Sequence, residues 1–438
     1  MNNTTRLTRD SLVETFMGYG RPRSGWLVGG EFERALVRPD GQPVGYHGPD
    51  GIRAVLEYIH DQIGWPGMYE AGNPIGLQGP RATVTLEPGG QVELSGAPHR
   101  RLPGLAEEML EARQHLLDFA ADRDLLWIAC GYTPYAKLDD IEWMPKGRYV
   151  VMREYLPQRG DLAHAMMKGT CSVQANFDYL DETDCSRKVG LAAKLAPLTT
   201  AMFANSPLRR GEDTGFKSFR AHIWTRTDPD RTGLPRALRE HYGHERWVDY
   251  LLDSPMMFYY RGGEYLPAHG RPFRAFLEDG HDGVFPTLDD WALHQTSVFP
   301  EVRVKHTIEV RGADCVSSEL AMSFCALFTG LMYCRRALDE AMDLADELQQ
   351  TCDRPTELLA RAAHRGLDAE AGGRSYGDWS SDLLDIATRG MARCHAEGLP
   401  MLEPLHANVE AGRCPADDIL DAFRRDPSPE NVLPVIAY

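Results

Sequence analysis

Residues 301–314, EVRVKHTIEVRGAD, constrain the fold more than any other stretch of this chain. Val or Ile occupies four even positions, and polar or charged side chains occupy the odd ones. This period of two predicts a β-strand with one apolar face and one polar face. The polar face would hold Arg303, Lys305, Glu309 and Arg311 in one row. Such a row is either solvent-exposed or built around a bound anion or metal ion.

The chain has 438 residues and a formal net charge of −17. Its length allows one large elaborated domain or two closely joined ones. The acidic balance argues against nucleic acid or an anionic membrane as a partner, but it is compatible with a local cationic pocket for a small anion. No apolar run approaches the roughly 18 residues that cross a membrane. The nine cysteines follow no disulfide or metal spacing, so we expect reduced thiols and a cytoplasmic protein.

Carboxylates also occur in pairs on two other predicted strands. In GGEFERALV, Glu31 and Glu33 are two residues apart and would share one face. In TVTLEPGGQVELS, the Pro-Gly-Gly sequence predicts a hairpin turn, with Glu87 and Glu93 on one face of the hairpin. Each pair taken alone also fits an ordinary solvent-exposed strand. With Glu309, however, the acids would come from at least three strands.

Amides and cations accompany these acids. The stretch TCSVQANFD alternates again and places Gln174 and Asn176 on its polar face, where amides could serve a substrate or metal site. A predicted loop region, FKSFRAHIWTRTDPDRTG, contains Arg220, Trp224 and Arg231. Binding residues concentrate on loops held by a rigid scaffold, and arginine holds carboxylates through two parallel hydrogen bonds. The two arginines are therefore candidates for binding a carboxylate.

Helical periodicity separates these predicted strands, and it continues through the final third of the chain. The clearest predicted helices cover residues 8–16, 50–63, 102–124 and 184–205. The predicted fold class is α+β, with an antiparallel sheet flanked by helices and a mostly helical C-terminal part. We expect residues 1–316 to form the sheet and its flanking helices, and residues 317–438 to form a helical region packed on the same domain.

The combination of acids and cations indicates a chemistry. Five carboxylates in one cavity would repel one another unless divalent ions neutralised them. All-oxygen ligands favour Mg²⁺ or Mn²⁺ over Zn²⁺, and no Cys/His spacing fits a zinc site. Arg303, Lys305 and Arg311 would add a place for a polyphosphate. A bound carboxylate could then be phosphorylated to an acyl phosphate, and an attacking amine would form an amide.

Seven motifs follow one another in a fixed order between about residue 29 and residue 314: GGEFE, LEPGGQVELSGAP, MPKGRYVVMREYLP, TCSVQANFD, FANSP, HIWTRTDPDRTG and FPEVRVKHTIEVRGAD. They resemble the successive motifs of the plant-type glutamate–cysteine ligases, which also occur in bacteria. The resemblance implies a glutamine-synthetase-like sheet that cradles ATP and metal. It also implies ligation of L-glutamate through γ-glutamyl phosphate. We expect a monomer or a homodimer.

The same resemblance suggests roles for particular residues. The implied metal ligands are Glu31, Glu33, Glu87, Glu93 and Glu309. The implied nucleotide-binding residues are Gln174, Asn176, Arg303 and Lys305. The implied catalytic residues are Glu309 and Arg311, the latter stabilising the transferring phosphoryl group. The candidates for substrate binding are Arg153, Arg220, Trp224 and Arg231.

Several positions depart from the family pattern. Val92, Ala175 and Ala221 stand where the family usually has Phe, Val and Ser. These changes remove bulk or a hydroxyl near the expected substrate site, so Val92 and Ala175 are further candidates for substrate binding. We therefore predict that the activation chemistry persists while the acceptor differs. The acceptor would be L-cysteine or a cysteine-sized analogue such as L-propargylglycine in specialised biosynthesis.

Two other functions fit parts of the pattern. A guanidino-type kinase on the same fold would consume ATP without any amine acceptor. A non-catalytic nucleotide-binding protein would release no ADP, although such a protein has no evident need for five mutually repelling acids.

Overall fold

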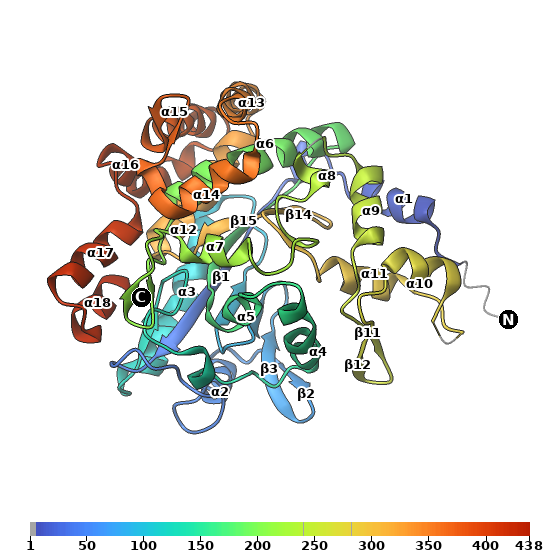
Figure 1. Ribbon diagram of the computed structural model, residues 1–438, viewed down its shortest axis with the longest axis horizontal. Helices are drawn as coiled ribbons and strands as arrows, with labels where there is room; N and C mark the ends of the chain where they lie inside the picture. The colour runs from blue at the N-terminus through green and yellow to red at the C-terminus, as the bar shows by residue number, and fades with distance from the viewer. Residues whose placement is uncertain (1–5, 240, 282) are drawn as a thin grey trace.

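A computed structural model describes residues 6–239, 241–281 and 283–438. Its centre is a nine-stranded sheet in the order β14-β15-β7-β1-β5-β4-β3-β2, with β6 paired to β1 (Figure 1). All neighbouring strands in this sheet are antiparallel. The strands are β1 Val28–Val37, β2 Gly67–Glu70, β3 Asn73–Gln78, β4 Thr83–Leu86, β5 Val92–Ser95, β6 Leu126–Ile128, β7 Ser172–Phe177, β14 Val302–Val304 and β15 Ile308–Asp314.

Helices make up most of the remaining structure. They are α1 Arg9–Met17, α2 Ile52–Ile63, α3 Leu102–Ala121, α4 Gly147–Tyr155, α5 Ala163–Gly169, α6 Glu182–Met202, α7 Phe219–Trp224, α8 Arg236–Arg239, α9 His244–Asp253, α10 Phe273–Asp279, α11 Leu288–Gln295, α12 Ser318–Met332, α13 Arg335–Gln350, α14 Pro355–Arg365, α15 Tyr376–Cys394, α16 Glu403–Glu410, α17 Pro415–Arg425 and α18 Pro429–Ile436. Short two-stranded pairings are β8 Leu208–Arg209 with β9 Glu212–Asp213, β10 Thr232–Gly233 with β13 Phe299–Pro300, β11 Phe258–Arg261 with β12 Glu264–Pro267, and β16 Glu370–Ala371 with β17 Arg374–Ser375.

The predicted strand over residues 301–314 is instead a hairpin. Strands β14 and β15 pair antiparallel, and the chain reverses between Val304 and Ile308. Arg303 therefore lies opposite Glu309 rather than further along one strand. The alternation continues through the turn because each odd residue of β14 pairs with an odd residue of β15. The sequence pattern thus identified the polar face correctly but missed the turn.

The two faces of the sheet have opposite characters. Helices α2, α3, α6 and α12 pack on one face, where Phe32, Val173 and Val310 join the main core. Helix α12 is buried along most of its length because it contacts the sheet, α3 and α15. Glu31 and Glu33 of β1, Glu93 of β5, and Glu309 and Arg311 of β15 face the other way. This second face carries the candidate site.

The predicted Pro-Gly-Gly turn is present between β4 and β5. Leu86 pairs with Val92, and the amide of Glu87 donates to the carbonyl of Gln91 at 2.8 Å. Gly90 has a φ of +90°, and a Cβ on Gly89 would lie 2.1 Å from the carbonyl oxygen of Lys168. Glycine is needed at both positions, for conformation and for close packing respectively.

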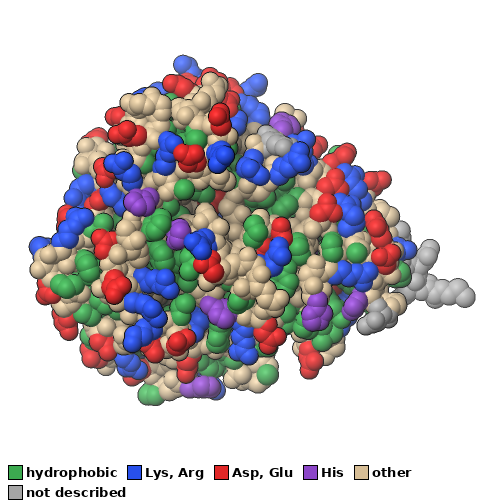
Figure 2. Space-filling view, viewed as in Figure 1, with side chains coloured by type: hydrophobic (Ala, Val, Ile, Leu, Met, Phe, Trp, Pro, Cys, Tyr) green, Lys and Arg blue, Asp and Glu red, His purple; other side chains and the backbone are tan. Residues whose placement is uncertain are grey.

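The fold class predicted from the sequence is confirmed: a large antiparallel sheet is flanked by helices, and the C-terminal region is helical (Figure 1). The domain boundary after residue 316 stays a prediction. All nine cysteines are free thiols, and most are buried. On the face shown in Figure 2, acidic and basic side chains are interspersed. In the described ranges, no helix is both long enough and apolar enough to cross a membrane.

Candidate active site

Strand register brings the predicted acids together. Glu33 on β1 lies directly opposite Glu93 on β5, and Glu31 lies between Ser95 on β5 and Gln174 on β7. Asn176, two residues further along β7, pairs with Glu309 on β15. Because residues two apart on a strand share a face, acids from three strands project from one side of the sheet. The sequence prediction of a shared acidic face is therefore confirmed.

The acids of β1 and β5 line a cavity of about 410 Å³, whereas Glu309 lies beneath its basic residues and is not part of the lining. Its acidic residues are Glu31, Glu33, Glu70, Glu87 and Glu93. Its basic residues are Lys146, Arg148, Arg220, Arg303, Lys305 and Arg311. The remaining wall includes Gln174, Trp224 and a group of apolar side chains from strands β2 and β3 and helices α4 and α5, namely Met68, Ile75, Met152, Met166 and Met167. The cavity thus combines a highly charged floor with an apolar wall.

Burial and mutual repulsion perturb the acids on β1 and β5. Desolvation, followed by the charges of Glu309 and Glu93, raises the pKa of Glu31 to about 7. Desolvation, followed by the charges of Glu93 and Glu87, raises the pKa of Glu33 to about 8. The pKa of Glu93 is raised by desolvation and by Glu87. Both causes disfavour the charged carboxylate, so these acids are poised to gain stability from a bound cation.

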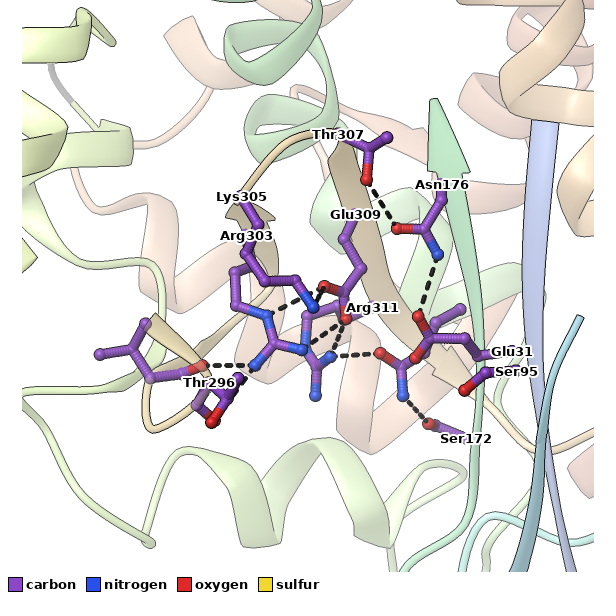
Figure 3. A network of polar contacts seen from close by, with 12 residues as sticks. Glu31, Ser95, Ser172, Asn176, Thr296, Arg303, Lys305, Thr307, Glu309 and Arg311 are labelled. Carbon is purple, nitrogen blue, oxygen red and sulfur yellow. Dashed lines mark hydrogen bonds and ion pairs between the residues drawn. The ribbon is translucent and has the colours of Figure 1, made fainter. Parts of the chain in front are cut away.

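Hydrogen bonds fix the orientation of two of these carboxylates. Glu33 accepts from the amide of Ser172 at 2.6 Å, from its hydroxyl at 3.0 Å and from Gln174 Nε2 at 3.3 Å. Glu31 accepts from Asn176 Nδ2 at 3.0 Å. Strand β7 therefore positions both acids of β1. Figure 3 shows the Asn176 amide pointing toward Glu31.

Glu309 has a different environment. It is fully buried and contacts Arg303 through both carboxylate oxygens, at 2.9 and 2.8 Å. Lys305 Nζ lies 3.3 Å away, and Arg311 bridges Glu309 and Gln174 (Figure 3). Despite desolvation, these three cations hold the pKa of Glu309 well below its usual range. Glu309 is thus held as a carboxylate anion at neutral pH, and it organises the cationic side of the cavity.

The predicted nucleotide-binding residues lie close together. Gln174, Arg303 and Lys305 line the main cavity. Asn176 lines an adjacent cavity of about 220 Å³, which shares Glu31 and Lys305 with the main one. Thr307 Oγ1 donates to Asn176 Oδ1 at 3.1 Å, which connects the turn of the β14–β15 hairpin to strand β7. The two cavities therefore meet at the acids and cations.

The structure does not bring every predicted substrate residue to the cavity. Arg220 and Trp224 line it, but Arg153 is exposed on α4 and is absent from its lining. Arg231 is fully buried elsewhere, with Nε 2.7 Å from Asp228 and two further bonds to backbone carbonyls. These partners already use the donors of Arg231, so its role in the fold is to hold a loop.

Val92 and Ala175 also lie away from the acids. Both belong to the apolar core on the helix-covered face of the sheet, because they alternate with the residues that point into the cavity. Ala221 is buried on α7 and does not line the cavity either. The prediction that these positions touch the substrates is not supported by their placement, since alternation along a strand directs neighbours to opposite faces.

Two cations that line the cavity were not selected from the sequence. Lys146 donates to the carbonyl of Leu86 at 2.8 Å, and Arg148 has a buried Nε without a hydrogen-bond partner in the described chain. Desolvation, followed by the charge of Arg148, lowers the pKa of Lys146 to about 8. Their stretch, MPKGRYVV, also fits a solvated helix start. The bond from Lys146 to the end of β4, and the presence of both residues in the cavity lining, reveal that they face the acids.

The fit of a divalent ion can be judged from the same geometry. In the described part of the chain, no cluster of three or more His, Cys, Asp or Glu side chains is arranged to hold a metal ion. Mg²⁺, however, is usually held by one or two carboxylates, with phosphate oxygens and water completing its shell. The facing acids Glu33 and Glu93, both raised in pKa, suit that mode of binding.

The comparisons with known proteins give the class of this protein, which is an ATP-dependent carboxylate–amine ligase. The family model of glutamate-cysteine ligase family 2 (GCS2) matches residues 27–434. This match covers most of the chain, which therefore belongs to the glutamate–cysteine ligase family 2.

Curated relatives agree with this assignment. The chain is 35% identical over 428 residues to the chloroplastic glutamate–cysteine ligase A of Oryza sativa subsp. indica, covering 96% of this chain and 85% of the relative. It is 35% identical over 431 residues to the chloroplastic glutamate–cysteine ligase of Brassica juncea, covering 96% and 82%. The crystal structure of glutamate–cysteine ligase from Francisella tularensis in complex with AMP has the same fold, with a TM-score of 0.57, 13% identity, and coverage of 94% of this chain and 87% of that one.

Proposed function

We propose that the protein joins the γ-carboxylate of L-glutamate to the α-amine of a small amino acid through γ-glutamyl phosphate. The observation that carries this proposal is one cavity in which buried acids with raised pKa values face Arg303, Lys305 and Arg311. Phosphoryl transfer depends mainly on positioning and on neutralising charge on the transferred group. A cationic row beside a set of acids supplies both requirements when divalent ions are present.

The proposed reaction has two steps. A γ-carboxylate oxygen of glutamate attacks the γ-phosphorus of ATP, the bond to the β-phosphate oxygen breaks, and ADP leaves. The acceptor amine then attacks the acyl carbon, inorganic phosphate leaves, and the amine loses a proton. Arg311 is suited to contact the transferring phosphoryl group, because Glu309 and Gln174 fix its guanidinium. Arg220, with a buried and unpartnered Nε in the cavity wall, is suited to hold a glutamate carboxylate.

Magnesium or manganese would be held by Glu33 and Glu93, with the remaining acids nearby. When bound, the ion would neutralise phosphate charge. The adjacent cavity beside Asn176 and Lys305 offers space for the rest of the nucleotide, since it opens from the cationic row. Acceptor and nucleotide would then approach the acids from different sides.

The acceptor is the finer part of the proposal. Methionines at positions 68, 152, 166 and 167, with Ile75, line the cavity. Methionine is flexible and polarizable, and such a wall favours a small apolar side chain without hydrogen-bonding needs. We therefore propose an unbranched amino acid of the size of cysteine, with L-propargylglycine as the preferred example and L-cysteine as its direct competitor. The proposal of an altered acceptor therefore rests on this apolar wall and no longer on Val92 and Ala175.

An acceptor panel tests the proposal. The protein is given ATP, MgCl₂ and L-glutamate, together with L-propargylglycine, L-cysteine, L-serine, L-2-aminobutyrate or no acceptor. ADP release is measured, and each product is identified by mass spectrometry. We expect a γ-glutamyl dipeptide, formed with a higher kcat/KM from L-propargylglycine than from L-cysteine. A clear preference for L-cysteine over every isostere would overturn the acceptor assignment while leaving the ligase intact.

The same panel separates the other functions. Sustained ADP release that does not depend on any amine acceptor would favour a kinase. Absence of ADP release with every acceptor, from protein that unfolds cooperatively, would favour a non-catalytic nucleotide-binding protein.

A further inference from the structure

A second large cavity, of about 450 Å³, lies behind the acidic one. It is enclosed by the helix-covered face of the sheet and by helices α2 and α3. Phe32 and Leu94 line this cavity, whereas their neighbours Glu33 and Glu93 line the acidic one. The same two strands, β1 and β5, therefore form a wall between two separate cavities. The rear cavity, as we call it, is not required by the proposed ligase reaction.

A buried cation lines the rear cavity. Arg34 is only 1% exposed, and its Nε has no hydrogen-bond partner in the described chain. Its other nitrogens donate to the carbonyls of Glu33 and Val316, at 2.7 and 3.1 Å, and to the thiol sulfur of Cys315 at 3.2 Å. None of these partners is a carboxylate. Arg34 also interacts with the side chain of Tyr438, which is not a carboxylate either. A buried cation gains stability from a neighbouring anion, so Arg34 is suited to bind one.

A second guanidinium approaches the same place. The Arg34 and Arg113 guanidinium carbons lie 4.1 and 5.0 Å from the centre of the Tyr438 ring. The Nε of Arg113 is also buried and unpartnered, and its carboxylate partner, Glu319, is 3.9 Å away. Two cations are thus held around one aromatic ring at the end of the cavity. Like charges near one ring repel each other, and an anion bound close to both would relieve that repulsion.

The acidic side chains on the lining do not supply that anion. Glu108 accepts from the amide of Ala97 at 3.1 Å and contacts His99 Nε2 at 3.2 Å. Glu111 is exposed to solvent. The remaining surface is mostly apolar and includes Phe32, Ile59, Val84, Leu94, Met109 and Leu116.

We propose that the rear cavity binds a small monocarboxylate with an aromatic or aliphatic body. The body would occupy the apolar space between the sheet and α3, and the carboxylate would pair with Arg34 and Arg113 near Tyr438. A mostly apolar cavity with a few convergent polar groups is the usual form of a small-molecule site. The proposal does not depend on the ligase assignment, because the residues that carry it lie on the opposite face of the sheet.

Isothermal titration calorimetry with 3-phenylpropionate tests this site. Two matched probes separate the contributions: 3-phenyl-1-propanol lacks the charge, and propionate lacks the ring. We expect 3-phenylpropionate to bind with a Kd on the order of 100 µM, from the affinity per atom usual for small ligands. Each matched probe should bind at least about tenfold more weakly. Equal binding of the acid and the alcohol, or no heat with 3-phenylpropionate, would overturn the proposal.

Two variants locate the binding. Ala112 lines the cavity from α3, so Ala112→Phe should fill the space and abolish binding of 3-phenylpropionate. Arg113→Gln removes a partly exposed cation. It should weaken the binding of 3-phenylpropionate at least about tenfold and leave the binding of 3-phenyl-1-propanol unchanged. Thermal unfolding checks that both variants are folded, and Arg113→Gln remains informative if Ala112→Phe is not. Binding that persists unchanged in both variants would show that the probe binds elsewhere. Loss of binding in the presence of saturating L-glutamate and ATP would show the same.

Discussion

Glu33 and Glu93 face each other directly across strands β1 and β5, with both side chains in the acidic cavity. Like charges directly opposite each other in an antiparallel pair destabilise a sheet. Burial adds to this effect, because Glu33 is only 8% exposed. The pair is therefore unfavourable for the folded chain alone and favourable for a chain that binds a divalent ion.

Glu93→Gln should stabilise the metal-free protein and impair catalysis. The pKa of Glu33 rises from 4.5 to about 8 in the folded chain, so the native state binds protons more strongly than the unfolded state within that window. The free energy of unfolding consequently falls as pH rises through it. Removing the neighbouring charge should raise that free energy at pH 8 by on the order of 1 kcal/mol. Urea unfolding in EDTA measures this, and ADP release should fall about 100-fold or more.

The exposed carboxylate Glu107 on α3 provides the control for this change. Glu107→Gln should leave both the unfolding free energy and the rate of ADP release within error of the unchanged protein. If Glu93→Gln instead lowered stability at pH 8 in EDTA, repulsion between the facing acids would not be the dominant effect.

Added Mg²⁺ should raise the midpoint of thermal unfolding more at pH 8 than at pH 6. At pH 6, protons occupy the acids whose pKa values are about 7 and about 8, and they compete with the ion. Ligand binding stabilises the native state by an amount that grows with the logarithm of the ligand concentration relative to its Kd. Scanning calorimetry at both pH values, with and without MgCl₂, measures the difference. An equal shift at the two pH values would indicate that the ion binds away from these acids.

Glu309→Gln should have the opposite effect on stability to Glu93→Gln. Glu309 neutralises Arg303, Lys305 and Arg311, so removal of its charge leaves three cations together in a buried site. Breaking such a buried network costs about 3–5 kcal/mol of unfolding free energy. The pKa of Glu309 is lower in the folded chain than its unfolded value of 4.5. Its contribution to the free energy of unfolding is therefore present above pH 4.5 and is lost as pH falls below that value. Urea unfolding at neutral pH would contradict this account if the two glutamine variants behaved alike.

Alternation along strands made the site largely predictable from sequence. The spacing of Glu31 from Glu33, and the Pro-Gly-Gly turn before Glu93, correctly placed acids on one sheet face. Alternation alone did not locate the reversal between Val304 and Ile308, because pairing of odd with odd residues preserves the pattern through the turn. The local sequence specifies which face a residue occupies more strongly than where a short strand ends.

Long-range packing accounts for the remaining differences. Arg231 and Arg220 look equivalent in sequence, yet Arg231 is bound to Asp228 and two carbonyls, whereas Arg220 lines the cavity. Departures from a family pattern at Val92 and Ala175 likewise indicated substrate contacts, although both side chains face the core. No local pattern reports which partner a buried arginine meets, because that depends on chain segments far away in sequence.

Arg311→Lys should lower kcat about 100-fold with little change in stability. The Arg311 guanidinium contacts both Glu309 and Gln174, and a lysine ammonium cannot reproduce that planar geometry. Loss of one positioned donor at a developing charge typically lowers kcat by about 100-fold to 1,000-fold. Initial rates of ADP release at saturating substrates measure kcat, and circular dichroism melting monitors the fold. A kcat close to that of the unchanged protein would exclude Arg311 from the phosphoryl site.

Arg220→Lys should raise the KM for L-glutamate at least about tenfold while leaving the KM for ATP nearly unchanged. Arg220 lines the acidic cavity, and its Nη2 donates to the carbonyl of Arg311 at 2.9 Å, which leaves its unpartnered Nε for a carboxylate. Lysine keeps the charge that Asp314 requires but loses the fork that binds a carboxylate at two points.

The nearby Arg226, paired with Asp161 at the surface, is the matched control, and Arg226→Lys should change neither KM. Steady-state kinetics with each substrate varied in turn distinguishes the possibilities. Equal increases in both KM values would assign Arg220 to the general architecture of the cavity, and an unchanged KM for L-glutamate would remove it from the glutamate site.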